Sequence, residues 1–215
     1  MKRIIALALA ATALTTCGIS AAEAATTTAT PRIYTSVPLT VAKPAPRGPT
    51  SAQLAKELLT VKQFPSGWSA TNVEVSYARE AFCGISGHLK ASTTGTAKAG
   101  FNNGMTPIFY EFIMGYKTAT SHLFARDVTR LNHCKSFSEN GFTFRVSHLR
   151  FPRLGTNSAA FQASGSVEGF GVGFDLVVAY RANQVVVGFC GDIGSPSIQL
   201  VKSEMRKAVA RLPKH

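Results

Sequence analysis

Residues 170–190 read FGVGFDLVVAYRANQVVVGFC, and this stretch decides the fold. Large apolar residues recur at every second position in its first half, which is the period of a β-strand. The row consists of Phe170, Val172, Phe174, Leu176, Val178 and Tyr180. Residues 181–183 form a short connection, in which Asn183 is expected to adopt a left-handed backbone, and the Val-rich segment 184–190 returns as the next strand. The short connection predicts antiparallel pairing, and the long apolar row predicts that the first of these strands is central.

Two further strands are predicted upstream of this pair. Apolar and polar residues alternate over residues 142–147 and again over 159–167, and a stretch rich in turn formers, 152–158, separates the two segments. Glu168 and Gly169 provide a tight turn into the central strand. The four strands are therefore predicted to form an antiparallel meander.

The chain closes with a predicted amphipathic helix. Ser195 is the expected N-cap, and Pro196 fits the first helical position, where a missing N–H costs nothing. The apolar residues at helical spacing are Ile198, Val201, Met205, Ala208, Val209 and Leu212. This helix is expected to cover the apolar side of the sheet.

The preceding half of the domain is predicted to mix helices and strands. Its predicted elements are a short helix after Ser51, a strand at 73–77, a strand at 107–116 and a helix at 118–132. The segment 84–100 is consistent with a loop, or with a poorly regular edge strand at 93–101. Together these patterns predict one α+β domain over residues 51–213, a mainly antiparallel twisted sheet packed by two or three helices, including a C-terminal helix.

Residues 1–24 are predicted to be a signal peptide. Lys2 and Arg3 precede an apolar run at 4–14, which is too short to span a bilayer as a stable anchor. Residues 25–50 are rich in Thr, Ala and Pro, cannot build a core, and are predicted to form a disordered linker. The domain is therefore expected to be extracytoplasmic.

Two processing sites fit the signal peptide. Ala22-Glu23-Ala24 has the small residues of ordinary signal cleavage, which would leave Ala25 as the first residue of a secreted protein. Residues 14–18 resemble a bacterial lipobox, in which Cys17 is lipidated and anchors the protein at the outer face of the cytoplasmic membrane; Thr16 departs from the residues usual before that cysteine. Both alternatives stand.

The domain contains three cysteines, Cys83, Cys134 and Cys190. In an oxidising compartment one disulfide is expected, and we predict Cys83–Cys134, with Cys190 as a buried free thiol. Closing a loop of about fifty residues stabilises a fold by roughly 4 kcal/mol at most. Pairing of Cys190 with Cys83 is the competing alternative.

No motif for catalysis or metal binding is present. The chain has neither CxxC nor HExxH, and residues 84–88, GISGH, lack the spacing of a hydrolase nucleophile elbow. Acidic residues are sparse, and no two are arranged for paired acid and base chemistry. The sequence therefore predicts no catalytic residue, no metal and no cofactor.

Positive charge dominates, with 23 Lys and Arg against 11 Asp and Glu. Such an exported protein attracts anionic envelope polymers or lipid head groups through long-range fields, whereas nucleic acid is not an expected partner outside the cell. Arg145, His148 and Arg150 lie on and beside one predicted strand and are a candidate anion-binding edge, with a solvated rim as the alternative.

The order of elements resembles a known family. The resemblance rests on Leu58-Leu59 in the first helix, the break at Phe64–Trp68, Cys83, Cys134 at the end of the middle helix, the Val-rich hairpin and the capped final helix. These features resemble the extracellular sensor domain of mycobacterial serine/threonine kinase H, a family that includes stand-alone actinobacterial lipoproteins and secreted proteins. The resemblance implies an α+β domain with a cleft for an unidentified ligand. This chain departs from it in lacking a kinase and a membrane helix, and in having three domain cysteines where the kinase domain has two disulfides.

The expected function is therefore that of an exported, non-enzymatic ligand-binding or sensor-like domain at the cell envelope, whose ligand is a small molecule or a cell-wall component. A cationic protein that binds anionic cell-wall polymers mainly by charge is the alternative, and a small secreted hydrolase is a more distant one.

Overall fold

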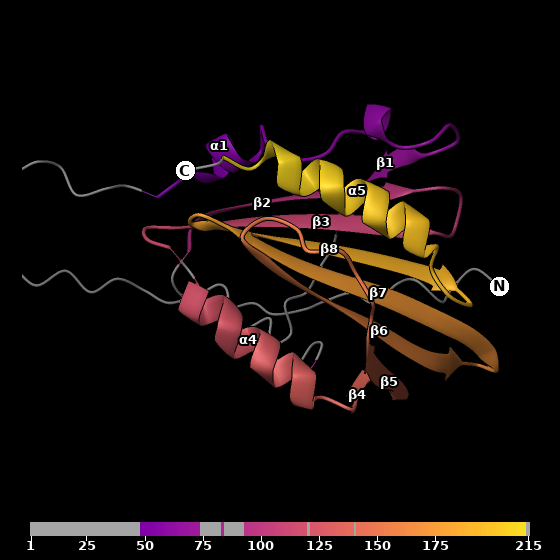
Figure 1. Ribbon diagram of the computed structural model, residues 1–215. Coiled ribbons are helices and arrows are strands. Elements are labelled where there is room, and N and C mark those ends of the chain that lie inside the picture. The colour runs from indigo at the N-terminus through magenta and orange to yellow at the C-terminus, as the bar shows by residue number, and fades with distance from the viewer. Residues whose placement is uncertain (1–47, 74–82, 84–92, 120, 140, 214–215) are drawn as a thin grey trace, which may run out of the picture. The chain divides into compact units, whose positions relative to one another are not determined.

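The computed structural model describes residues 48–213 apart from 74–82, 84–92, 120 and 140. Within these residues the chain forms one eight-stranded antiparallel sheet in the order β1-β2-β3-β8-β7-β6-β5-β4, with three α-helices (Figure 1). The predicted α+β class is thus confirmed. The strands are β1 Ser69–Thr71, β2 Thr93–Asn102, β3 Ile108–Tyr116, β4 Ser136–Glu139, β5 Phe142–His148, β6 Asn157–Val167, β7 Phe170–Arg181 and β8 Gln184–Ile193; the helices are α1 Ser51–Leu54, α4 Ser121–His133 and α5 Ile198–Arg211, and Val61–Gln63 form a 3-10 turn.

The predicted meander is present as β5 to β8, and β7 lies inside the sheet between β6 and β8. The β7–β8 connection differs in detail, because the left-handed residue is Ala182, with φ 52°, and not Asn183. Asn183 is instead tied to β3: its Nδ2 donates to the Tyr116 carbonyl at 2.8 Å, and its own carbonyl accepts from Tyr116 N at 2.9 Å.

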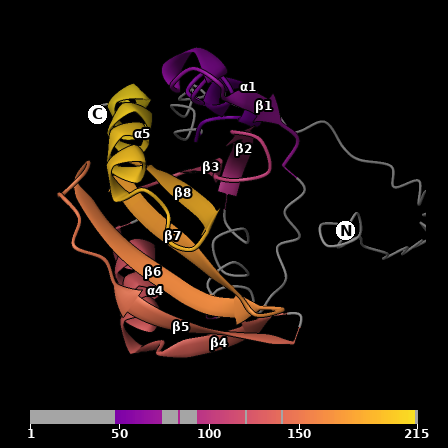
Figure 2. The same cartoon turned by 90° about the vertical axis from the view of Figure 1, so that its right-hand side faces the viewer.

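Helices cover both faces of the sheet (Figures 1 and 2). On one face α5 packs through Val201 and Met205 on a cluster that includes Ile113, Val177 and Val186. On the other face α4 packs on a second cluster. The α4 cluster includes Met114, Tyr116, Phe124, Leu131, Leu176, Val178, Tyr180 and Val185.

The long apolar row of β7 therefore faces α4 and not the C-terminal helix that was expected to cover it. Small residues explain the arrangement, because α5 approaches the sheet closely: a Cβ atom at Gly188 would collide with Met205 Sδ. The residues of β7 between the members of the row include Ala179, which is fully buried on the α5 side.

The starts of two helices differ from those predicted from the sequence. The first helix is capped by Thr50, whose side chain accepts from Gln53 N, while the Ser51 hydroxyl accepts from Thr96 N of β2. The cap of α5 is Ser197, whose hydroxyl accepts from Leu200 N, so Ser195 and Pro196 precede the helix.

The remaining differences concern short or irregular segments. A strand at Ser69–Thr71 was not predicted, and residues 74–77 of the predicted strand at 73–77 lie outside the described part, so that prediction stands as made. The 93–102 segment is a strand that pairs with β3 along most of its length, and β4 was not predicted. Cys17, the signal peptide and residues 25–47 also lie outside the described residues, so these predictions stand as made.

Candidate functional site

A row of aromatic rings crosses the α4 side of the sheet. The ring centroids of Tyr110 and Phe189 are 6.1 Å apart, and those of Phe189 and Phe174 are 5.2 Å apart. The row continues from Phe174 to Phe144 at 5.2 Å and from Phe144 to Phe137 at 5.2 Å. It thus joins side chains from β3, β8, β7, β5 and β4. We call these five residues the aromatic row.

Glycine explains how the row crosses β6, which contributes no ring to it. Gly165 of β6 lies opposite Phe144 of β5 and opposite Val172 of β7. A Cβ atom at Gly165 would lie 2.7 Å from Cδ1 of Phe144, so any larger residue would displace that ring. Similarly, a Cβ atom at Gly191 would lie 3.1 Å from Cδ1 of Phe174.

The aromatic row is only partly covered. Phe144 is buried, whereas Tyr110, Phe137, Phe174 and Phe189 are half-buried. Burial raises the pKa of the Tyr110 hydroxyl, which keeps that group neutral and able to donate a hydrogen bond. The row therefore offers apolar ring surface with one polar group at its β3 end.

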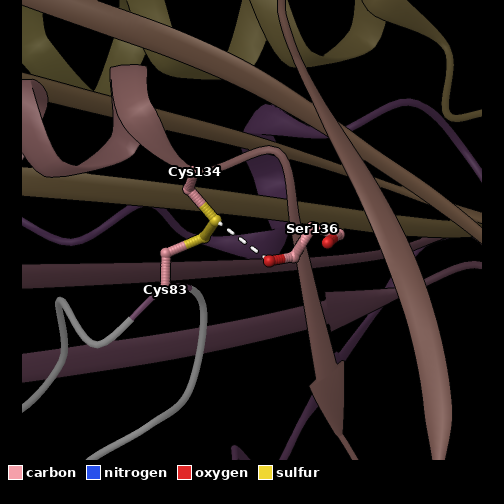
Figure 3. Close-up of a disulfide and its surroundings, with 3 residues drawn as sticks. All are labelled: Cys83, Cys134 and Ser136. Carbon is pink, nitrogen blue, oxygen red and sulfur yellow. Dashed lines mark hydrogen bonds between the residues drawn. A yellow bond between two sulfur atoms is a disulfide. The ribbon is translucent and has the colours of Figure 1, made fainter.

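An open depression adjoins the end of α4 and is lined by Cys83, Thr129, Arg130, His133 and Cys134. The structure joins Cys83 and Cys134 in a disulfide with a Cα–Cα distance of 6.1 Å (Figure 3). Cys134 Sγ lies 3.5 Å from the Ser136 carbonyl. Because Ser136 directly precedes Phe137, the depression borders the β4 end of the aromatic row.

The three predicted anion-binding residues are all exposed but do not share one face. His148 lies on the α4 side, with its ring centroid 5.1 Å from that of Phe161. Arg145 belongs to the opposite parity of β5 and faces the other side, and Arg150 follows the strand. Anion binding by these residues stays a prediction.

Cys190 is a free, buried thiol on the α5 side. Burial, together with Asp175 and Asp192, raises the pKa of this thiol to about 12. It is therefore protonated and unreactive at neutral pH.

Buried acidic residues were missed by the sequence reasoning. Glu111, Asp127, Asp175 and Glu204 are all buried. Glu111 and Asp175 sit in segments whose alternation predicted strands. An acidic residue at an inward-facing position of an alternating strand pattern indicates a buried carboxyl group, and this signal is present in the sequence for both residues.

The site is thus an aromatic sheet surface on a disulfide-bonded α+β domain. The fold is similar to the crystal structure of the extracellular domain of PknH from Mycobacterium tuberculosis, with a TM-score of 0.60 and 10% sequence identity over 77% of this chain and 97% of that chain. The resemblance noted in the sequence is confirmed as a likeness of fold. No protein-family model matches the chain, and no curated protein matches it. In the described residues, no helix has the length and apolarity needed to cross a membrane.

Proposed function

We propose that this protein is an exported, non-enzymatic ligand-binding domain of the sensor type. The aromatic row carries the proposal, because half-buried rings in a continuous line provide a binding surface for an apolar or planar ligand. The fold shared with an extracellular domain and the disulfide support a site of action outside the cytoplasm.

The neighbouring charges favour a ligand that also has an anionic group. Arg130 and His133 line the depression beside the β4 end of the row, and both are exposed. An apolar body on the rings and an anionic group near α4 would use both features at once.

The test is a titration with the anionic aromatic dye 8-anilinonaphthalene-1-sulfonate, followed by dye fluorescence. We expect saturable binding. Phe174→Ala and Phe189→Ala should each raise the dissociation constant of the dye about tenfold, since each removes a stacking interaction of about 1–1.5 kcal/mol. Phe170→Ala is the matched control, because Phe170 lies on the same strand and the same parity but is 66% exposed at the end of β7. Equal weakening by all three substitutions would contradict binding at the aromatic row.

A second candidate function is charge-driven binding of anionic envelope polymers, with Arg145, His148 and Arg150 among the contributing cations. The 23 Lys and Arg of the chain favour it. Binding of a soluble anionic polymer, such as polyglutamate, that is lost in 0.5 M salt would support this function, because salt screens exposed charges. Dye binding that survives the same salt would support the first.

The proposed location includes two alternatives, a released protein that begins at Ala25 and a lipoprotein attached through Cys17. Intact mass of the protein from its native host separates them. A diacylglycerol-sized increment on Cys17 identifies the lipoprotein, and an unmodified N-terminus at Ala25 identifies the released form.

A further inference from the structure

Glu111 is a carboxyl group buried in the middle of the sheet. It lies on β3, has no exposed surface, and faces the α5 side together with Phe109 and Ile113. Its Oε2 accepts a hydrogen bond from Leu59 N at 2.7 Å. Its Oε1 is buried and has no hydrogen-bond partner among the described residues. Such an arrangement suits a protonated carboxyl far better than a carboxylate.

The charged groups around Glu111 come from two packed segments. From α5 come Arg211 and Glu204, which is 1% exposed and is paired in turn with Lys207. Glu57, in the segment before η1, lies beside Arg211 and accepts a hydrogen bond from Gln184 of β8. The positions directly opposite Glu111 on the neighbouring strands are Ala99 and Gly188, which contribute no charge.

The two nearby cations are engaged elsewhere. Lys207 Nζ lies 2.7 Å from Glu204 Oε1 and also donates to the Gln63 carbonyl. Arg211 donates to the carbonyls of Glu57 and Lys56 at 2.8 and 2.9 Å. In the described part of the chain neither cation forms an ion pair with Glu111, and one carboxyl oxygen each of Glu57 and Glu204 is buried there without a hydrogen-bond partner. Acidic oxygens thus outnumber the available cations here.

These contacts hold one segment of the chain against the sheet. Residues 55–64 form most of the connection between α1 and β1 and contribute Leu59 and Phe64 to the core. Side chains from β3 and α5 bind the backbone of this segment at Leu59, Glu57, Lys56 and Gln63. Glu111 supplies the one contact of this set that comes from the sheet itself.

We propose that Glu111 is a proton-controlled latch, which holds residues 55–64 against β3 and α5 while its carboxyl is protonated and releases them when the proton is lost to solvent. Release hydrates the carboxylate, which cannot be solvated while the segment is closed. The latched segment follows α1, which is bound to β2 separately through Ser51, so the state of the latch sets how firmly residues 55–64 themselves are attached to the sheet. An exported domain meets the ambient pH, which makes such a response useful.

The sign follows from the pKa of the closed form. Burial is the largest cause and raises the pKa of Glu111 from 4.5 to about 7; the Leu59 hydrogen bond and Arg211 lower it, and Glu204 raises it. Since the closed state binds the proton more tightly than the open state, its stability falls as the pH rises from the ordinary range of a carboxyl through about 7. The opening equilibrium constant is expected to increase about tenfold between pH 6 and pH 8.

Amide hydrogen exchange of Leu59 measures this opening directly, because its N–H donates to Glu111. After correction for the intrinsic pH dependence of exchange, the full mature protein should show the tenfold increase in opening. Fluorescence of Trp68, the only tryptophan, gives a second readout, since its ring lies 4.9 Å from Phe64 at the end of the segment. If the opening constant measured at the Leu59 amide of the wild-type protein changes less than twofold from pH 6 to pH 8, the proposal is wrong, and no variant is needed to show it.

Glu111→Gln keeps an oxygen acceptor for Leu59 and cannot titrate, so its opening constant should be independent of pH over this range. Asp175→Asn is the matched control: Asp175 is another fully buried carboxyl on the α5 side whose pKa burial raises, and it hydrogen-bonds Gln162 rather than the latched segment. The control should retain the wild-type pH dependence. If Glu111→Gln retains it as well, or if Asp175→Asn abolishes it, Glu111 is not the latch. Neither result bears on dye binding at the aromatic row, which lies on the other face.

Discussion

The two faces of the sheet are made by the same strands, yet they differ in how completely they are covered. On the α5 face aliphatic side chains, Phe109 and the helix close the surface, so that Glu111, Asp175 and Glu204 lose almost all contact with water. On the α4 face four of the five rings of the aromatic row stay half-buried. Adjacent residues of β3 illustrate the contrast, because Tyr110 belongs to the open face and Glu111 to the closed one. On the closed face the free energy of unfolding depends on whether the buried carboxyl groups are protonated. On the open face apolar surface remains accessible to a partner.

The strongest test of this contrast compares two phenylalanines. Phe109→Ala should lower the free energy of unfolding by about 3–5 kcal/mol, since a fully buried ring leaves a cavity on the closed face. Phe189→Ala should cost roughly 1–2 kcal/mol, because the half-buried ring loses less transfer energy. Urea unfolding at constant m-value measures both. Equal costs for the two substitutions would show that the open face is as tightly packed as the closed one.

The disulfide provides the next largest effect and belongs to the α4 side. The double substitution Cys83→Ser with Cys134→Ser should lower the free energy of unfolding by about 2–4 kcal/mol, because the closed loop constrains the unfolded chain. Hydrogen exchange should then increase more in α4, which ends beside Cys134, than in α5. Protection lost equally from both helices would contradict the view that the two faces are stabilised independently.

Sequence periodicity predicted the strands and helices with long, regular patterns. Strands β5 to β8 and helices α4 and α5 carry their apolar residues at the spacing of their element, and the structure contains all of them. The short strands β1 and β4 were not predicted because three or four residues do not establish a period. The same limit applies to the first helix, which has only four residues; beyond it, Leu59 N donates to Glu111 and not to a helical carbonyl.

Periodicity shows which residues share a face, but not which layer covers that face. The long row of β7 was therefore assigned to the C-terminal helix and packs on α4 instead. The aromatic row could not be predicted from the sequence for a related reason. Its members come from five strands, and β3 pairs with β8 although many residues separate them in the chain, so only the register of the folded sheet brings the rings together.

The smallest effect concerns the cap of the helix that closes the α5 face. Both Ser195 and Ser197 could cap α5, and the structure assigns the cap to Ser197 through its hydrogen bond from Leu200 N. Ser197→Ala should therefore lower the free energy of unfolding by about 1 kcal/mol, and Ser195→Ala, at an exposed position before the helix, by less than about 0.5 kcal/mol. Hydrogen exchange in the first turn of α5 should increase only for Ser197→Ala. Pro196, just before this turn, approaches β7 at Gly173, where its Cδ would lie 3.0 Å from an added Cβ, so a loosened helix start would weaken the packing at the edge of the closed face. A larger cost for Ser195→Ala would instead restore the helix start that the sequence predicted.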